Sequence, residues 1–179
     1  MFFSAALRKT PLKLALDSKT KEEMKAVVRK YSNEDSASIK VLFSQFVNYH
    51  MKFDNSFVKV KENEILFLEY IDSSISEDSF NCSVAEIEDK VVGYCVSKIE
   101  EKPPVYPDPT YGYIENLCTS EEYQRQGIGL LLVQDAFAWF KTRDVSRIEC
   151  FAAIQNPKST SFWRKLGFQS IMEQMYFQI

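Results

Sequence analysis

The sequence predicts a single α/β domain built on a mixed sheet. Its 179 residues, of which 45% are hydrophobic, are enough to bury one substantial core. Two β-branched or alternating runs between residues 82 and 99 predict a β-hairpin. From Tyr113 to Gly167 the pattern changes to strand, helix, strand and helix, so strands and helices alternate in the second half of the chain.

The domain is predicted to begin with a strand over residues 24–31. Ser32 and Asp35 then offer N-cap chemistry for a helix that runs towards His50, whose apolar residues recur at helical spacing. We expect a second helix around residues 62–71, and the Ser-rich segment that follows it is typical of a polar loop.

The central hairpin is expected to pair residues 82–87 with residues 91–99 through a turn at Asp89 and Lys90. The four prolines within residues 100–110 cannot contribute N–H groups to a sheet, so this segment is expected to be a surface loop. Further strands are predicted over 113–119 and 147–153, and further helices over 128–140 and from Pro157 to Gly167. Residues 168–179 are expected to close the domain as a hairpin.

The first 23 residues are interpreted as a short basic extension, and residues 24–179 as the domain itself. Within the first 21 residues five basic side chains accompany one acidic one, which superficially resembles an organellar transit peptide. The basic residues follow the apolar FFSAAL segment, an order that disfavours a secretory signal. A cytoplasmic protein is therefore the favoured interpretation.

Composition disfavours several classes of partner. A net charge of -3 disfavours a nucleic-acid-binding surface, and there is no apolar run long enough to span a bilayer. The four cysteines lack the close pairing of a zinc or redox site, and His50 is the single histidine, so no metal is expected. The cysteines are interpreted as reduced thiols of the core.

The segment QRQGIG, residues 124–129, is a candidate anion site. Gly127 and Gly129 remove side chains where the chain enters a helix, so the free amides of residues 125–130 can converge on a phosphate. Two glycines at this position are also compatible with simple capping or close packing. A Walker loop is excluded because no Gly-Lys-Ser/Thr follows, and Leu132 occupies the third glycine position of a dinucleotide fingerprint.

The longer stretch YIENLCTSEEYQRQGIG, followed by RIECFAAIQN and FWRKLGF, resembles the GNAT family of N-acetyltransferases. The resemblance is specific over about residues 84–170, and the stretch from Glu115 to Gly129 looks most similar to the diamine and small-amine acetyltransferases. It implies the GNAT fold, with a mostly antiparallel central sheet that is splayed at the cofactor site and flanked by helices.

The resemblance also implies that acetyl-CoA is the co-substrate. Its pyrophosphate would lie on the backbone amides of Arg125, Gln126, Gly127, Ile128, Gly129 and Leu130. Its pantetheine amides would pair with the backbone of Leu117, Cys118 and Thr119. Asn156 occupies the position of a cofactor-contacting Asn in the family, although a turn residue before Pro157 is an equal interpretation.

Glu115 is the candidate catalytic base. An amine with a pKa of ~10.4 arrives protonated and must lose a proton before it can attack a thioester. Strand alternation places Glu115 on the same side as Tyr113 and Leu117. Exposure to water does not readily account for a carboxylate inside a sheet, which makes Glu115 a candidate base. The alternative is a charge that reaches solvent or pairs with an arginine.

Trp163 stands four residues before Gly167, where the family often has a tyrosine that protonates the CoA thiolate. An indole can donate one hydrogen bond but does not titrate usefully, so Trp163 could shape the thioester pocket. Packing in the core is an equal alternative. A thiolate with a pKa near ~8.5 can leave without an acid, because water can protonate it.

The favoured function is acetyl transfer from acetyl-CoA to the primary amine of a small molecule, by a protein that forms a homodimer and binds neither nucleic acid nor membrane. Two alternatives stay open. The chain could be a CoA-binding module with little transfer activity, or it could acetylate a protein N-terminus or a lysine.

Overall fold

The fold is given by a computed structural model, which describes residues 26–53 and 62–177. The basic extension predicted over residues 1–23 lies outside the described residues. In chain order the elements are β1 (Val27–Lys30), the 3-10 turn η1 (Asn33–Asp35), α1 (Ser36–His50), α2 (Asn63–Ser74), β2 (Phe80–Ile87), β3 (Lys90–Glu101), β4 (Thr110–Thr119), η2 (Glu121–Tyr123), α3 (Ile128–Lys141), β5 (Ile148–Cys150) and α4 (Pro157–Lys165).

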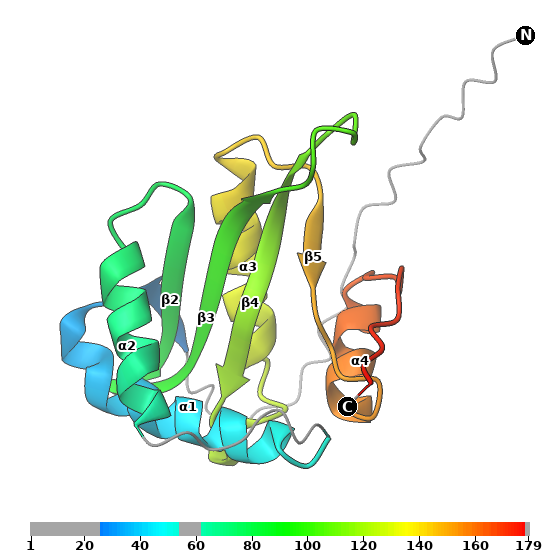
Figure 1. The fold of residues 1–179 in the computed structure, drawn as a ribbon. Helices are drawn as coiled ribbons and strands as arrows, with labels where there is room; N and C mark the ends of the chain where they lie inside the picture. The colour runs from blue at the N-terminus through cyan, green and yellow to red at the C-terminus, as the bar shows by residue number, and fades with distance from the viewer. Residues whose placement is uncertain (1–25, 54–61, 178–179) are drawn as a thin grey trace, which may run out of the picture.

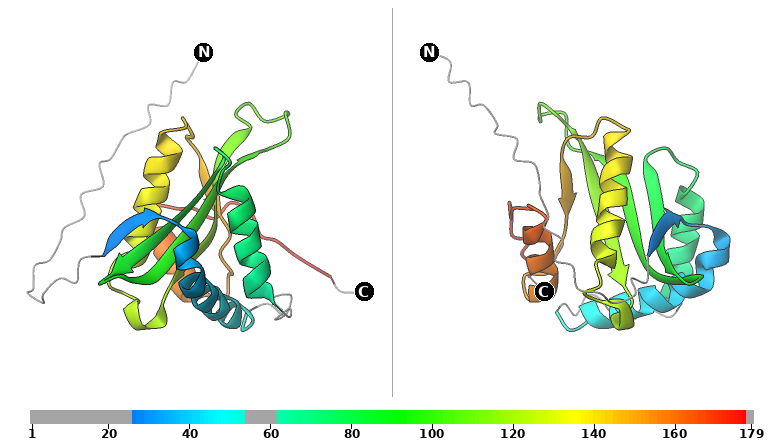
Figure 2. Two further views of the ribbon diagram at one scale, coloured as in Figure 1. Left: turned by 90° about the vertical axis from the view of Figure 1, so that its left-hand side faces the viewer. Right: turned by 180° about the vertical axis from the view of Figure 1, so that it is seen from behind.

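The strands form one mixed sheet in the order β1-β2-β3-β4-β5. The first four strands are antiparallel to their neighbours, and β5 runs parallel to β4. Helices α1 and α2 cover one face of the sheet, α3 covers the other, and α4 lies beyond the end of β5 (Figures 1 and 2). The predicted mixed α/β architecture is confirmed.

Two apolar clusters hold the layers together, one on each face of the sheet. The first joins α1 and α2 to the sheet through buried residues such as Ile39, Ile71 and Tyr94. The second joins α3 to the sheet and includes Leu132 and Phe140, both 0% exposed. Because consecutive strand residues point to opposite faces, β2 and β3 supply side chains to both clusters.

The predicted central hairpin is confirmed, but its turn lies one residue earlier than expected. Ile87 pairs with Lys90, which leaves Glu88 and Asp89 as the two turn residues. Both have positive φ, 48° and 60°. A two-residue hairpin with the backbone twist of the strands requires this conformation, which Asp tolerates better than most residues.

The predicted closing hairpin over residues 168–179 is wrong for the part of it that the structure describes. Residues 168–177 contain no strand, and β5 spans residues 148–150 in place of the predicted 147–153. Phe168 packs against the core, but the side chains of residues 169–177 are exposed, with Met172 at 87% and Phe177 at 88%. The apolar residues of this segment do not alternate regularly. A strand also needs a neighbouring strand to accept its hydrogen bonds, and the short β5 offers little edge.

Three of the four cysteines, Cys82, Cys95 and Cys118, are buried and free, as predicted, and Cys150 is half-buried. Burial raises the pKa of the Cys118 thiol to about 12. Its S–H group donates to the Leu42 carbonyl oxygen at 3.3 Å, so this thiol stays protonated within the core.

Asp35 fixes the junction between β1 and α1. Its carboxylate accepts two hydrogen bonds of 2.8 Å from Arg29 and one of 2.8 Å from the Ser32 backbone N–H. Burial acts to raise the pKa of Asp35, but the hydrogen bonds from Arg29 and Ser32 outweigh it and hold this pKa below the ordinary value of 3.8.

We therefore expect Asp35→Asn to lower the free energy of unfolding by about 1.5 kcal/mol at pH 7, the low end for hydrogen bonds to a charged group, because Arg29 is 39% exposed. A carboxyl with a lowered pKa stabilises the fold above its unfolded-state pKa, and this contribution is lost as the pH falls through the folded-state value. Urea unfolding of both proteins should show a difference that shrinks below pH 3.8. A difference independent of pH would contradict this explanation.

Candidate active site

The candidate site begins where β4 and β5 separate. Strand β4 pairs with β3 from Thr110 to Thr119, but it pairs with β5 only from Gly112 to Ile114. The segment 115–119 therefore has an edge that no described strand covers. Unpaired N–H and C=O groups along such an edge can bind an extended chain that carries amides. Leu117, Cys118 and Thr119, the predicted pantetheine contacts, lie on this open part of β4.

A β-bulge turns the side chains of β4 at the same point. Asn116 pairs with Val96 whereas Ile114 pairs with Ser97, so Glu115 is the extra residue on its strand. A bulge breaks the alternation of side chains and re-aims them. Glu115 and Asn116 consequently line the same cavity, on the face that α1 and α2 cover.

The predicted alternation along β4 is therefore only partly correct. Glu115 shares the face of Tyr113, because Lys98 pairs with Glu115 and lies over the Tyr113 ring. Leu117, which was expected on that side, instead packs against the cluster beneath α3. The bulge is the physical reason, since it shifts every residue after Glu115 by one face.

Glu115 has two polar partners. The Tyr70 hydroxyl donates to its Oε2 at 2.7 Å, and Lys98 Nζ lies 3.0 Å from its Oε1. Lys98 also pairs with Glu100 at 2.8 Å. Glu115 therefore forms an ion pair with a lysine, whereas the predicted alternative to a catalytic role was a pair with an arginine. Its side chain is 27% exposed.

The two partners of Glu115 keep their protons at neutral pH. Burial and the hydrogen bond to Glu115 raise the pKa of Tyr70 to about 12. Burial acts to lower the pKa of Lys98, but its pairs with Glu100 and Glu115 raise it by more, and the net shift is upward. Tyr70 and Lys98 therefore act as fixed donors to a carboxylate and are unsuited to accept a proton from an amine.

A cavity of about 420 Å³ opens above Glu115, between the sheet and the first two helices. Its walls are mainly aromatic and aliphatic, and its lining residues are Phe43, Phe46, Val47, Phe67, Tyr70, Glu115 and Asn116. The Phe43 and Phe67 rings are stacked, with centroids 3.9 Å apart and an interplanar angle of 7°. Asn116 Oδ1 accepts a hydrogen bond of 2.8 Å from the Tyr94 hydroxyl.

The QRQGIG segment leads into α3 as predicted. Gly127 is the N-cap with φ 85°, and Arg125 also has a positive φ of 63°. The first turn of a helix leaves its N–H groups without intrahelical acceptors, and here Leu131 N–H donates back to the Gly127 carbonyl at 3.1 Å. The exposed loop thus presents backbone amides and the positive end of the helix dipole to solvent.

The loop and the open strand edge adjoin each other. A side chain added at Gly129 would place its Cβ 3.7 Å from Thr119 Oγ1 and 3.5 Å from the Phe162 ring. The structure therefore brings together two of the segments that the sequence assigned to one cofactor, the helix start and the end of β4. No ligand contact tests the individual assignments, which stay predictions for Arg125, Gln126, Gly127, Ile128, Gly129 and Leu130.

Asn156 caps α4. Its Oδ1 accepts hydrogen bonds from the Ser159 N–H at 3.1 Å and from the Tyr49 hydroxyl at 3.3 Å, and the residue is 3% exposed. Asn156 thus has a structural role as the N-cap of α4, with Pro157 at the first helical position. A cofactor contact by Asn156 stays a prediction.

Trp163 lies in the core. It is 7% exposed, and its ring contacts Phe162 and Phe168 with centroids 5.0 and 4.9 Å away. It is not among the residues that line the cavity above Glu115. Packing accounts for Trp163 as observed, and its proposed influence on the thioester stays a prediction.

Several residues of this site are not predicted from the sequence, above all Tyr70, Lys98 and the stacked pair Phe43 and Phe67. Lys98 carried a usable signal, because its spacing from Val96 places it on the same face of a largely buried strand. A lysine at such a position requires a partner of opposite charge. The aromatic residues carried no such signal, since phenylalanines at helical spacing are typical of an ordinary core.

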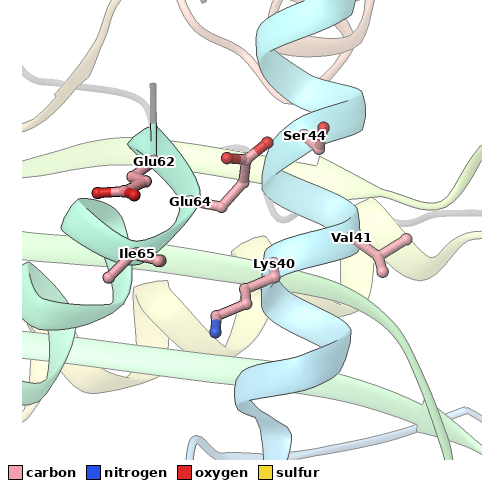
Figure 3. Close-up of a pocket in the computed structure, with 6 residues that line it drawn as sticks. All are labelled: Lys40, Val41, Ser44, Glu62, Glu64 and Ile65. Atoms are coloured by element: carbon pink, nitrogen blue, oxygen red, sulfur yellow. The ribbon is translucent and has the colours of Figure 1, made fainter. Parts of the chain in front are cut away.

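A second hollow, of about 440 Å³, lies between α1 and α2 away from the β4 edge (Figure 3). It is lined by Lys40, Val41, Ser44, Glu62, Glu64 and Ile65, none of which belongs to β4 or α3.

Among the described residues no group of three or more His, Cys, Asp or Glu side chains could hold a metal ion. Nor is any helix there long and apolar enough to cross a membrane.

A family model and several solved structures are similar to this chain. The family model described as "Acetyltransferase (GNAT) family" matches residues 45–168. A mutant of a Bacillus halodurans protein superposes with a TM-score of 0.75 at 21% identity, over 86% of this chain and 99% of that chain.

Two further solved structures share the fold. An aminoglycoside 6'-N-acetyltransferase from Acinetobacter haemolyticus has a TM-score of 0.68 at 18% identity, over 86% of this chain and 97% of its own. A predicted acetyltransferase from Clostridium acetobutylicum, solved with acetyl-CoA, has a TM-score of 0.70 at 16% identity, over 86% and 96%. Comparison with curated protein sequences gives no significant match.

Proposed function

The chain belongs to the acetyltransferase (GNAT) family and is therefore an N-acetyltransferase. We propose that it transfers the acetyl group of acetyl-CoA to the primary amine of a small molecule. One observation carries this proposal. Glu115 lies on the wall of an open cavity and beside the uncovered edge of β4, so a carboxylate and an amide-binding edge meet at one point. We propose a small acceptor because the sequence from Glu115 to Gly129 resembles the motif of small-amine acetyltransferases.

In the proposed reaction Glu115 removes a proton from the acceptor ammonium, directly or through a water molecule. The free amine then attacks the thioester carbonyl and forms the new C–N bond. The attached nitrogen loses its second proton to water, and the C–S bond breaks to release CoA thiolate. A backbone N–H near Leu117 or Cys118 would stabilise the oxyanion. The thiolate, with a pKa near ~8.5, takes its proton from water.

We propose that acetyl-CoA lies along the open edge of β4 and ends at the start of α3. The pantetheine arm would pair with the backbone of Leu117, Cys118 and Thr119, and the pyrophosphate would accept hydrogen bonds from the amides of residues 125–130. Gly129 supports this path, because a residue without a side chain keeps the space between Thr119 and Phe162 open.

Gly127→Ala should weaken acetyl-CoA binding about tenfold, because an alanine disfavours the left-handed conformation that aims the loop amides. Gly167→Ala is a matched control. Gly167 also has a positive φ, 97°, and open space around it, but it follows α4. Isothermal titration with acetyl-CoA should give a higher Kd for the first variant and an unchanged Kd for the second. Equal effects of both changes would contradict the proposed cradle.

The proposed function is tested by incubating the purified protein with acetyl-CoA and a panel of primary amines while free thiol is measured. Thiol release that depends on an added amine, with the N-acetylated amine as product, is the expected result. Tight acetyl-CoA binding without such release would instead favour the CoA-binding module. Homodimer formation and a cytoplasmic location stay predictions.

A further inference from the structure

The cavity above Glu115 is lined by five aromatic or aliphatic residues out of seven. Phe43 and Phe46 come from α1 and Phe67 from α2, so three phenylalanine rings from two helices surround the space in front of one carboxylate. The stacked Phe43 and Phe67 rings are half-buried, as is Phe46. Walls of this kind favour a flat apolar group, which packs against the aromatic side chains and is removed from water.

The polar groups of the cavity are few and already engaged. Among its described lining residues Glu115 is the single carboxylate, and Lys98 lies 3.0 Å from it. The Tyr70 hydroxyl is bonded to Glu115, and Asn116 Oδ1 to Tyr94. A polycation would find no unpaired carboxylate in these walls, and a polyhydroxylated amine would lose hydrogen bonds to water without replacement.

On the basis of these lining residues, we propose that the acceptor is an arylalkylamine, a primary amine joined by a short alkyl chain to an aromatic ring. This proposal rests on the proposed acetyl transfer. The ring packs on the cavity-facing surfaces of Phe43, Phe46 and Phe67, and the amine reaches Glu115 and the open edge of β4. A Phe face within reach of the ammonium adds a cation–π attraction before the proton is lost. Long polyamines and amino sugars are excluded as preferred acceptors.

The test compares kcat/KM for four amines, namely 2-phenylethylamine, propylamine, spermidine and glucosamine, with thiol release as the readout. We expect 2-phenylethylamine to exceed each of the others by roughly 10- to 100-fold, the effect of burying a phenyl ring. The advantage over propylamine should lie mainly in KM, because the ring binds equally before and during the reaction.

The variants Phe43→Gln and Val41→Gln form a matched pair on α1. Phe43 lines the cavity, whereas Val41 is 58% exposed and lines the hollow on the other side. Phe43→Gln should reduce the preference for 2-phenylethylamine over propylamine about tenfold, while Val41→Gln leaves it unchanged. Because the preference is a ratio of two amines on one protein, partial unfolding does not alter it.

If Phe43→Gln does not fold, titration of 2-phenylethylamine and propylamine into the wild-type complex with CoA measures the same selectivity without turnover. A better rate with spermidine or glucosamine, or an unchanged preference in folded Phe43→Gln, would overturn the arylalkylamine proposal and leave the acetyl transfer intact. Failure of every amine to release thiol, although acetyl-CoA binds, would overturn the acetyl transfer itself.

Discussion

Glu115→Gln is expected to lower kcat/KM for acetyl transfer about 100-fold or more at pH 7, the range in which general bases contribute. Glutamine retains an oxygen that can accept the Tyr70 hydroxyl hydrogen bond, so the cavity keeps its shape while the proton acceptor is lost. The rate of the variant should rise about tenfold per pH unit up to the amine pKa of ~10.4, because the free amine then needs no base. Thiol release with 2-phenylethylamine from pH 6 to 10 measures both effects.

Glu100→Gln is the matched control for this prediction. Glu100 contacts the same lysine, with its Oε1 2.8 Å from Lys98 Nζ, but it does not line the cavity. Removal of the Glu100 charge should leave the pH dependence of the acetyl-transfer rate the same as in the wild type. Equal losses in Glu115→Gln and Glu100→Gln would indicate that the Lys98 network acts through structure alone, and would contradict a base at position 115.

Gly112→Ala should lower the free energy of unfolding by about 1–3 kcal/mol, the usual cost of overpacking. Gly112 is buried in β4, and a Cβ at this position would lie 2.5 Å from Phe140 Cε1, inside contact distance. Phe140 is 0% exposed and cannot move towards solvent without disrupting the cluster beneath α3. An alanine in a strand would otherwise stabilise by roughly 0.5–1 kcal/mol, so the predicted sign depends on this contact.

A double-mutant cycle identifies the cause. In a Phe140→Leu background the ring is gone, and Gly112→Ala should be less destabilising than in the wild type by about 0.5–3 kcal/mol. Urea unfolding of the four proteins gives this coupling energy. Additive effects would show that the cost at Gly112 does not come from Phe140.

The order of the elements could be predicted from the sequence because their signals are local. The helical spacing in α1 and α3, the hairpin of β2 and β3, and Gly127 before α3 depend on residues within a few positions of one another. The closing hairpin failed for the opposite reason. A strand there needed a long partner strand, and β5 has only three residues.

The candidate site likewise has features with local sequence signals and features that depend on how the strands pair. Glu115 and the loop of Gly127 and Gly129 could be selected from the sequence, because a carboxylate within a strand is unusual and the two glycines stand in a stretch that resembles the GNAT family. The β-bulge could not be selected, since it is a property of how β3 and β4 pair. Without the bulge, Leu117 was assigned to the wrong face.

The sequence by itself thus determined the α/β class, and it selected the candidate anion-binding loop and Glu115 as the candidate base. Only the tertiary structure decided the surroundings of Glu115, because its partner Tyr70 lies 45 residues away in the chain and Lys98 lies on the neighbouring strand. It also decided that phenylalanines with core-like spacing line a cavity. Periodicity shows which side of a helix is apolar, but what faces that side depends on how α1 and α2 pack on the sheet.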